Sequence, residues 1–409
     1  MSSRRGFTEV TRRWEGEPGR LGPRRSRQAF VYRAYVPDTV SGWEPQVGAS
    51  VVAALSDAEE ACRRLDPHPL GLGTLDALTR QLLRSEAVAS SRIEGLRMSH
   101  RRLAFAQSVA GHDDRADEVL ANISAMERAV EVAAVAPRIG VDDLCAIHAT
   151  LLAGTRDERV AGLLRTEQNW IGGEASSPAG AEFVPPPPDD VPRLVADLTR
   201  FMDRRDLPPA LHAALVHAQF ETIHPFADGN GRVGRALIHL VLQRSGLRHG
   251  VVPPISLALG ADADRYVAGL TSYRFGDYED WVALFADALA RSARAGEGFA
   301  HDVAALRGRW AAAAGSPRRG STAEGLIRLL PGRPVLTTPE AAHELGVSHE
   351  AARKALNRLA DAGVVRDRAA GRRLRVWEAV GLFDVLDRLE RRVGNPARAP
   401  RPTRAPGSL

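Results

Sequence analysis

The chain has 409 residues, of which 44% are hydrophobic and 5% aromatic, and its formal net charge is +5; this length allows two or three domains whose cores need no disulfide support. Its two cysteines, Cys62 and Cys145, have no metal-ligand spacing around them, which argues against a disulfide framework and against a zinc site. Neither a run of roughly 18 apolar residues nor the apolar centre of a signal peptide occurs, so we expect a cytoplasmic protein without a membrane span.

Residues 1–45 are predicted to form a partly disordered arm, because Arg, Gly and Pro are frequent there and few apolar residues are periodic. One packed piece is expected within this arm, at 30–37. From 46 to 135 the apolar residues recur at helical spacing, for example at Val51, Leu55 and Ala58. This N-terminal region is therefore predicted to be helical, and the abundance of Ala, Leu and Arg favours a mainly α-helical chain.

Residues 136–300 combine further helices with one stretch of different composition. The stretch 162–192 contains Trp170, Phe183, a Gly-Gly pair and four consecutive prolines, which predicts a short hairpin followed by an extended turn. Two helices are expected next, at about 209–223 and 232–244. The loop between these two helices has a composition that a simple connector would not need.

This loop, with the first turn of the following helix, reads HPFADGNGRVGR over 224–235. Positive φ angles cost little at Gly229, Asn230 and Gly231. Their backbone N–H groups are therefore predicted to converge into an anion-binding nest just before a helix N-terminus. Arg232 and Arg235 stand three residues apart, so both guanidinium groups would extend from the first turn of that helix toward phosphate oxygens.

Two titratable side chains accompany this nest. Asp228 offers a carboxylate that could hold Mg²⁺, with phosphate oxygen and water filling the other ligand positions. His224 has an ordinary pKa close to neutrality and could take a proton from an attacking hydroxyl. A histidine at a helix end or a Gly-Asn-Gly turn is usually structural when it occurs alone, but their combination in one loop predicts a nucleotide-binding catalytic site.

The segment 224–235 resembles the signature of Fic-domain proteins: a His, a Phe two residues later, an acidic residue, Gly-Asn-Gly-Arg and a second Arg. The resemblance implies a Fic-type helical domain that transfers AMP from ATP to a Ser, Thr or Tyr hydroxyl of a target protein with Mg²⁺ present. It implies that His224 is the general base and Asp228 the Mg²⁺ ligand. The phosphate-binding residues that it implies are Gly229, Asn230, Gly231, Arg232 and Arg235. The base of the donor nucleotide stays open, because these groups recognise phosphates.

The resemblance extends over about 30–290. Residues 162–188 resemble the hairpin flap of the family, whose exposed edge pairs with the target segment as an added strand; a surface hairpin packed by Trp170 is the alternative. Tyr266 is similar to a family position beside the nucleotide, although a core aromatic residue is at least as good an interpretation.

A second resemblance concerns regulation. The sequence SSRIEG over 90–95 is similar to the inhibitory pattern of the family. In a helix Ser90 and Glu94 lie on one face, and Gly95 can end the helix. We expect Glu94 to pair bidentately with Arg235 and to remove the clamp that orients the γ-phosphate. In some members the corresponding carboxylate positions a water and AMP is removed from the target, so the direction of the reaction stays open.

Residues 322–390 are predicted to form a separate domain that resembles a winged helix-turn-helix. Arg353, Lys354 and Arg358 lie near one face of its second helix and could meet DNA phosphates, whereas a protein-binding winged helix is an equal alternative. A DNA-binding regulator that only senses nucleotide is thus the rival to the enzyme. Residues 391–409, rich in Pro and Arg, are predicted to form a disordered tail. A homodimer is also compatible with the sequence.

Overall fold

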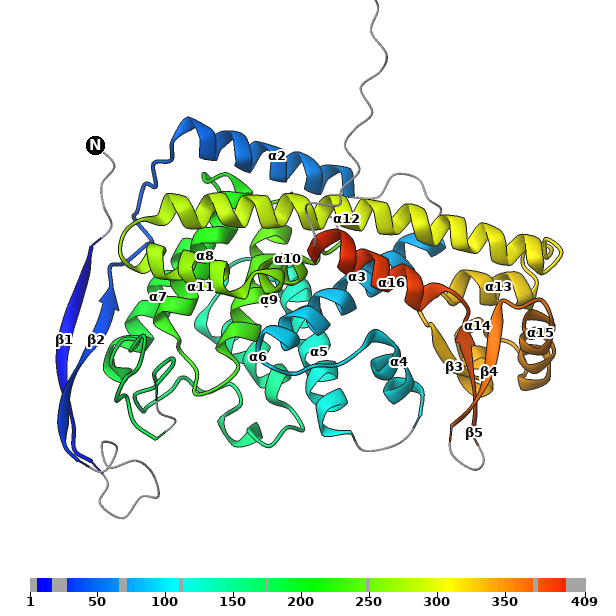
Figure 1. The fold of residues 1–409 in the computed structure, drawn as a ribbon, viewed down its shortest axis with the longest axis horizontal. Helices are drawn as coiled ribbons and strands as arrows, with labels where there is room; N and C mark the ends of the chain where they lie inside the picture. The colour runs from blue at the N-terminus through cyan, green and yellow to red at the C-terminus, as the bar shows by residue number, and fades with distance from the viewer. Residues whose placement is uncertain are drawn as a thin grey trace, which may run out of the picture.

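The computed structural model describes residues 6–16, 28–65, 72–109, 113–173, 176–247, 251–370 and 374–394, and the fold is mainly α-helical, as predicted (Figure 1). The N-terminal region contains α2 (Ala49–Leu65), α3 (Leu72–Ile93), α4 (His100–Ser108) and α5 (Asp114–Val135). The middle region contains α6 (Val141–Leu152), α7 (Val191–Met202), α8 (Pro209–Ile223), α9 (Asn230–Arg244), α10 (Ile255–Ala261), α11 (Ala263–Arg274) and α12 (Tyr278–Ala313). Short 3₁₀ turns stand at Glu158–Val160 and Pro188–Asp190.

Helices α8 and α9 form the centre of the molecule. Every residue of α8 from Ala210 to Ile223 is buried, and α9 is buried along most of its length. A helix that is covered on all sides needs apolar residues around its whole circumference, which α8 supplies. Helix α8 ends where the predicted loop begins, and α9 begins close to where that loop ends, so two buried helices of the core support the loop.

The long helix α12 connects this core to the C-terminal part of the chain. It packs along α2 and α16, and Figure 1 shows it running across the molecule beside α2. The C-terminal elements are α13 (Thr322–Leu329), β3 (Val335–Thr337), α14 (Thr338–Leu345), α15 (His349–Asp361), β4 (Val365–Ala370), β5 (Leu374–Ala379) and α16 (Leu382–Gly394). Their three strands form an antiparallel sheet in the order β3-β5-β4.

The N-terminal arm contains more regular structure than its composition indicates. Strands β1 (Phe7–Trp14) and β2 (Phe30–Pro37) form an antiparallel ribbon, and β2 is the packed piece expected at 30–37. The sequence analysis missed β1, because its apolar residues do not alternate as in a half-buried strand. Strand β1 is stabilised instead by its partner strand and by aromatic contacts such as Phe7 with Tyr35, at 4.6 Å between ring centroids. The rest of the predicted arm, 1–5 and 17–27, lies outside the described residues.

Two other expectations need correction. The predicted hairpin within 162–188 is a loop closed by one bridge, between Ile171 and Phe183. Gly172 and Gly173 both have positive φ, and the prolines that follow Phe183 have no N–H to continue a ladder. The tail predicted from residue 391 begins later, because α16 continues to Gly394; residues 395–409 lie outside the described residues.

Both cysteines are free thiols, as expected. Within the described ranges, we find no helix with the length and hydrophobicity needed to cross a membrane.

Candidate active site

The loop between α8 and α9 has two left-handed residues, one at each end. His224 has φ 49° and Gly229 has φ 75°. The predicted nest of three positive-φ residues is wrong at Asn230 and Gly231, which form the first turn of α9. The reason is that the Asn230 side chain accepts from Phe226 N and donates to Phe226 O, both at 2.8 Å, and so closes the loop directly onto the helix.

The anion-binding groups are therefore those of a helix N-terminus. The first intrahelical hydrogen bond of α9 runs from Val233 N to Gly229 O, so the N–H groups of residues 230–232 have no intrahelical acceptor. These N–H groups, together with the helix dipole, favour a negative charge in front of α9.

The flap loop, whose described residues are 162–173 and 176–188, holds the turn between α8 and α9 in place. Arg165 Nε donates to His224 O at 2.8 Å, and its Nη2 donates to Pro186 O at 2.6 Å. Asn169 Nδ2 donates to Phe226 O at 3.1 Å. Phe226 is fully buried and stacks on His148 at 3.8 Å between ring centroids. Sequence reasoning gave no role to Arg165 or Asn169, because nothing within 162–188 indicates that its polar side chains reach a loop tens of residues away.

The imidazole of His224 is neutral at physiological pH. Burial, together with the positive charges of Arg274 and Arg165, lowers the pKa of His224 to about 4. Its Nδ1 atom lies 3.8 Å from Glu221 Oε2. A neutral imidazole is the form that can accept a proton from a hydroxyl.

Arg235 is enclosed by the end of α3. Its side chain is 1% exposed, and it donates to Ser90 Oγ at 2.8 Å, to Ser90 O at 2.9 Å and to Glu94 Oε1 at 2.7 Å. Only one Glu94 oxygen takes part, whereas the sequence analysis expected a bidentate pair. Burial would raise the pKa of Glu94, but Arg235 outweighs burial and lowers it.

Glu94 also lies against the N-terminus of α9. A Cβ atom at position 231 would collide with Glu94 Oε1, which shows how closely the carboxylate covers the first turn of the helix. Gly95 follows with φ 86° and ends α3, which places the Glu94 side chain at the very end of that helix. A carboxylate of this chain thus occupies the position that favours an anion.

Asp228 and Arg232 form the outer part of the site. Arg232 Nη2 lies 2.9 Å from Asp228 Oδ2, and the Asp228 side chain is 55% exposed. No group of three or more His, Cys, Asp or Glu side chains that could hold a metal ion occurs among the described residues. A cation at Asp228 would therefore depend on phosphate oxygens and water for its other ligands, as Mg²⁺ commonly does.

Tyr266 lies in the core beneath the site. Its hydroxyl is 2.8 Å from His217 Nε2, and its ring contacts Trp281. Burial raises the pKa of the Tyr266 hydroxyl. The structure therefore favours the core interpretation of Tyr266, on the buried side of Arg235.

Two segments of the chain match models of one protein family. Residues 138–242 match the family model described as Fic/DOC family, and residues 52–131 match the model described as Fic/DOC family N-terminal. The chain contains a Fic/DOC domain with its N-terminal region. Both matched segments contribute to the site, since α3 lies in one of them and α8 and α9 lie in the other.

The Fic domain is similar to curated proteins over part of its length. Protein adenylyltransferase fic-1 of Caenorhabditis briggsae is 32% identical over 151 residues, which are 36% of this chain and 27% of that protein. A probable protein adenylyltransferase of Aquifex aeolicus is 42% identical over 69 residues, 17% of this chain and 22% of that protein. The chain thus spans about a quarter of the length of these relatives.

Two solved structures share the fold. A Fic family protein from Desulfovibrio desulfuricans G20 has a TM-score of 0.51 at 23% identity, covering 83% of this chain and 99% of that chain. A Fic domain containing signaling protein from Bacteroides thetaiotaomicron has a TM-score of 0.50 at 19% identity, covering 62% and 97%. The predicted mainly helical Fic fold is confirmed, and the described residues also form small antiparallel sheets.

Two charged residues of the Fic domain that sequence reasoning missed lie beside His224. Glu221 is buried, and burial raises its pKa to about 7. Arg274 is also buried, with its guanidinium 3.8 Å from the centre of the Phe183 ring. The spacing of Glu221 three residues before His224 could have indicated that contact, since residues three apart on a helix are neighbours. No comparable signal marks Arg274.

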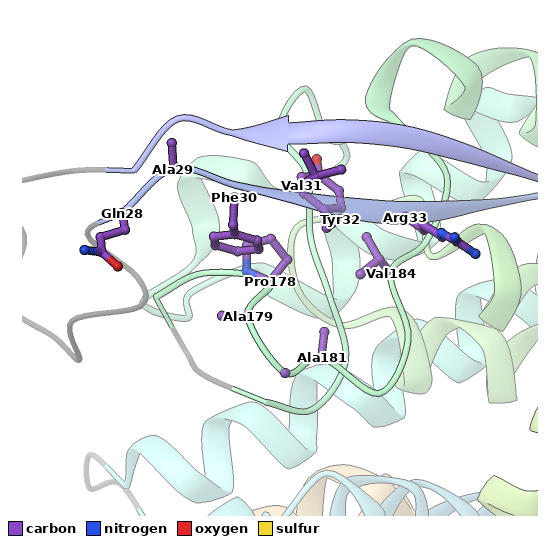
Figure 2. Close-up of a pocket in the computed structure, with 11 residues that line it drawn as sticks. Gln28, Ala29, Phe30, Val31, Tyr32, Arg33, Pro178, Ala179, Ala181 and Val184 are labelled. Carbon is purple, nitrogen blue, oxygen red and sulfur yellow. The ribbon is translucent and has the colours of Figure 1, made fainter.

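A cavity of about 510 Å³ opens between β2 and the flap loop (Figure 2). Figure 2 shows Phe30, Val31 and Tyr32 on the ribbon side and Pro178, Ala179 and Ala181 on the loop side. The charge of Arg165, which binds His224 O, acts on the Tyr32 hydroxyl at the wall of this cavity. Its loop side belongs to the same segment as Arg165, which holds the loop between α8 and α9.

Proposed function

We propose that this Fic domain is a protein adenylyltransferase, which transfers AMP from ATP to a Ser, Thr or Tyr hydroxyl of a target protein, and that Glu94 inhibits it. The observation that carries the proposal is the position of the Glu94 carboxylate, in front of α9 and hydrogen-bonded to Arg235. A site that attracts one anion in this way suits the phosphates of a nucleotide. The similarity to curated proteins that are named as adenylyltransferases supports the same activity.

The phosphates would be held by the N-terminus of α9 and by two arginines, Arg232 and Arg235. The exposed carboxylate of Asp228 fits a Mg²⁺ ion shared with phosphate oxygens, and the ion would neutralise part of the phosphate charge. Binding of the triphosphate requires Glu94 to leave Arg235, because the γ-phosphate and the Glu94 carboxylate would compete for the same guanidinium.

The transfer itself needs one proton acceptor. The target hydroxyl oxygen attacks the α-phosphorus of ATP, the bond from this phosphorus to the bridging oxygen breaks, and pyrophosphate leaves. The hydroxyl proton passes to Nε2 of the neutral His224 imidazole. Positioning by a rigid helix and charge neutralisation supply most of the rate in such phosphoryl-type transfers.

We place the target segment at the cavity between β2 and the flap loop. Tyr35 N donates to Val184 O at 2.9 Å, so the outer edge of β2 already pairs with the loop at one point. An extended segment could continue this pairing along β2 and bring its hydroxyl toward His224.

A second reaction has its own support. Glu94 reaches Arg235 through Oε1 alone, which leaves Oε2 able to orient a water molecule. With AMP already on a target hydroxyl, such a water could attack the phosphorus as the bond from this phosphorus to the target oxygen breaks. AMP would then leave, and the water would lose one proton while the target oxygen takes up a proton to become the free hydroxyl. In this reaction Glu94 is required, whereas in adenylyl transfer it is inhibitory.

The C-terminal elements have the order helix, strand, helix, helix, strand, strand, which supports a winged-helix domain. The basic face predicted on α15 is smaller than expected. Arg358 donates to Ala314 O, while Arg353 and Lys354 both lie within reach of Glu350. We therefore propose a protein rather than DNA as the partner of this domain; a salt-dependent shift of arbitrary duplex DNA would contradict that choice.

The test of the main proposal compares three proteins: wild type, Glu94→Gly, and Glu94→Gly with His224→Ala. Each is incubated with Mg²⁺, ATP labelled at the α-phosphate and a cell extract, and labelled protein bands are counted. We expect label with Glu94→Gly, less with wild type, and none with the double variant although it still binds ATP. Loss of label from a pre-adenylylated target in wild type but not in Glu94→Gly would favour the removal reaction instead. No transfer and no removal by any of the folded proteins would refute the enzyme.

A further inference from the structure

Glu221 places a carboxylate beside the catalytic imidazole. It lies on the last turn of α8, its side chain is 8% exposed, and its Oε2 is 3.8 Å from His224 Nδ1. A Cβ atom at Gly234 would collide with Glu221 Oε1, so the carboxylate is packed tightly against the second turn of α9. Both the α8 and the α9 backbone therefore fix its position.

Two buried polar atoms in this pair have no hydrogen bond. Glu221 Oε1 and His224 Nδ1 both lack a well-aligned hydrogen-bond partner among the described residues, although the backbone carbonyl of Glu221 also faces the His224 ring. An unpaired buried polar group costs about 1–3 kcal/mol, and a carboxylate costs more when ionised. Two such groups side by side indicate that they interact in a state other than the resting one.

The charged and titratable groups that act on Glu221 all belong to the site. They are His224 on the loop, Arg235 on α9, Glu94 at the end of α3, and Arg274 and Tyr266 on α11. Two of these groups are cations, which allow Glu221 to ionise despite its burial. No contact to Asp228, the proposed Mg²⁺ ligand, occurs among its described interactions.

We propose that Glu221 is a positioning residue for His224: its carboxylate accepts a hydrogen bond from Nδ1 while Nε2 takes the proton of the target hydroxyl. This inference rests on the proposed transfer reaction. A small rotation of the imidazole would shorten the 3.8 Å separation to hydrogen-bond distance. The contact would keep the proton on Nδ1, leave Nε2 free as the acceptor, and stabilise the imidazolium that forms.

The charge state of Glu221 then sets the pH dependence. Burial raises the pKa of Glu221 to about 7 and lowers that of His224 to about 4. Above pH 7 the carboxylate is ionised and strengthens the imidazole as a base, whereas below pH 7 it is protonated and this support is lost. Transfer should therefore decline as the pH falls through about 7, while the imidazole itself is still neutral.

The experiment uses the full chain in the Glu94→Gly background, so that inhibition does not mask the effect. Glu221→Gln is expected to lower kcat about 10- to 100-fold, to leave the KM for ATP within about twofold, and to remove the decline near pH 7. Glu221→Asp should restore part of kcat. The matched control is Asp197→Asn, which changes an equally buried carboxylate on α7 that accepts from Val40 N and Ser41, and it should leave the pH profile unchanged.

A measurement that needs no catalysis separates the proposed role of Glu221 from the proposed AMP transfer. In protein labelled with ¹⁵N-histidine, the His224 imidazole is titrated by NMR in wild type and in Glu221→Gln. The variant should lower the pKa of His224 and raise the fraction of the tautomer protonated at Nε2. Identical titration curves, or an unchanged pH profile of transfer, would overturn the role of Glu221. An altered titration in a protein that never transfers AMP would support the contact and refute the enzymatic proposal.

Discussion

Replacing Glu94 by glycine should strengthen ATP binding and weaken the nucleotide-free fold at the same time. Glu94 contributes one hydrogen bond of 2.7 Å to Arg235 and occupies the front of α9. Without it, Arg235 keeps its two bonds to Ser90 but remains a buried cation that has lost its hydrogen-bonded carboxylate. Removal of the Glu94 carboxylate therefore destabilises the nucleotide-free protein and strengthens the binding of phosphates.

The magnitude follows from the exposure of the pair. A hydrogen bond between charged groups contributes about 1.5–3 kcal/mol, but the Glu94 side chain is 38% exposed, so solvent screening reduces this to about 1–2 kcal/mol. If ATP must displace this contact, its removal should lower the Kd for ATP about 5- to 30-fold. The melting temperature of the empty variant should fall, and saturating ATP should raise it by more than in wild type.

The assay is calorimetric titration of Mg·ATP into wild type, Glu94→Gly and Glu94→Gln. The glutamine variant separates the loss of charge from the added backbone freedom of glycine, and both variants should bind more tightly than wild type. The gain should shrink at high salt, because part of it is the screened attraction between Glu94 and Arg235. Equal Kd values in all three proteins at low salt would refute the view that Glu94 and the nucleotide compete for one site.

Three further outcomes are expected. Asp228→Ala should lower transfer at least about 100-fold and remove the Mg²⁺ dependence of ATP binding, as measured by calorimetry with and without EDTA, while urea unfolding stays unchanged because the side chain is largely exposed. Burial would raise the pKa of Glu390, but hydrogen bonds from His100 and Arg92 outweigh it and lower the pKa to about 2. The stability from this contact is therefore present above the ordinary pKa of a glutamate and lost as the pH falls toward 2, so urea unfolding between pH 6 and 2 should depend less on pH in Glu390→Gln. Hydrogen exchange of α3 should stay unchanged when ATP binds, except at the turn that carries Glu94.

The sequence predicted the parts of the site whose constraints are local. The loop 224–235 holds its histidine, its acidic residue and both arginines within a few residues of one another, so spacing alone places them together. The same reasoning failed at Asn230, where a side-chain hydrogen bond to Phe226 starts the helix earlier than glycine content predicts. A rule about permissive φ angles contains no information about which side chain closes the loop.

The supporting residues could not be predicted, because they depend on contacts between distant segments. Arg165 binds His224 O across 59 positions of sequence, and Asn169 binds Phe226 O across 57. Strand β1 likewise exists because β2 pairs with it. Only Glu221 carried a local signal, and it is weak, because a glutamate three residues before a helix end is common on solvated helices. Glu221 differs from such residues because its side chain is buried. A sequence pattern that predicts a helix buried on all sides does not reveal how deeply one particular side chain is buried.

The tethers of α3 indicate how Glu94 would leave Arg235 if it inhibits the domain as proposed. Glu86 accepts from Ser256 N at 2.8 Å and from Ser256 Oγ at 2.6 Å, Ser91 Oγ accepts from Asn122 at 3.0 Å, and Arg92 pairs with Glu390 at 2.9 Å. Each contact contributes about 1 kcal/mol or more, and the first two are fully buried. Moving the whole helix would break all of these contacts together. It would therefore cost more free energy than breaking the single contact between Glu94 and Arg235. We therefore expect the release of Glu94 to be local: its side chain would turn away at the end of α3, where Gly95 already has a left-handed backbone, while the remainder of the helix stays packed on α9 and α10.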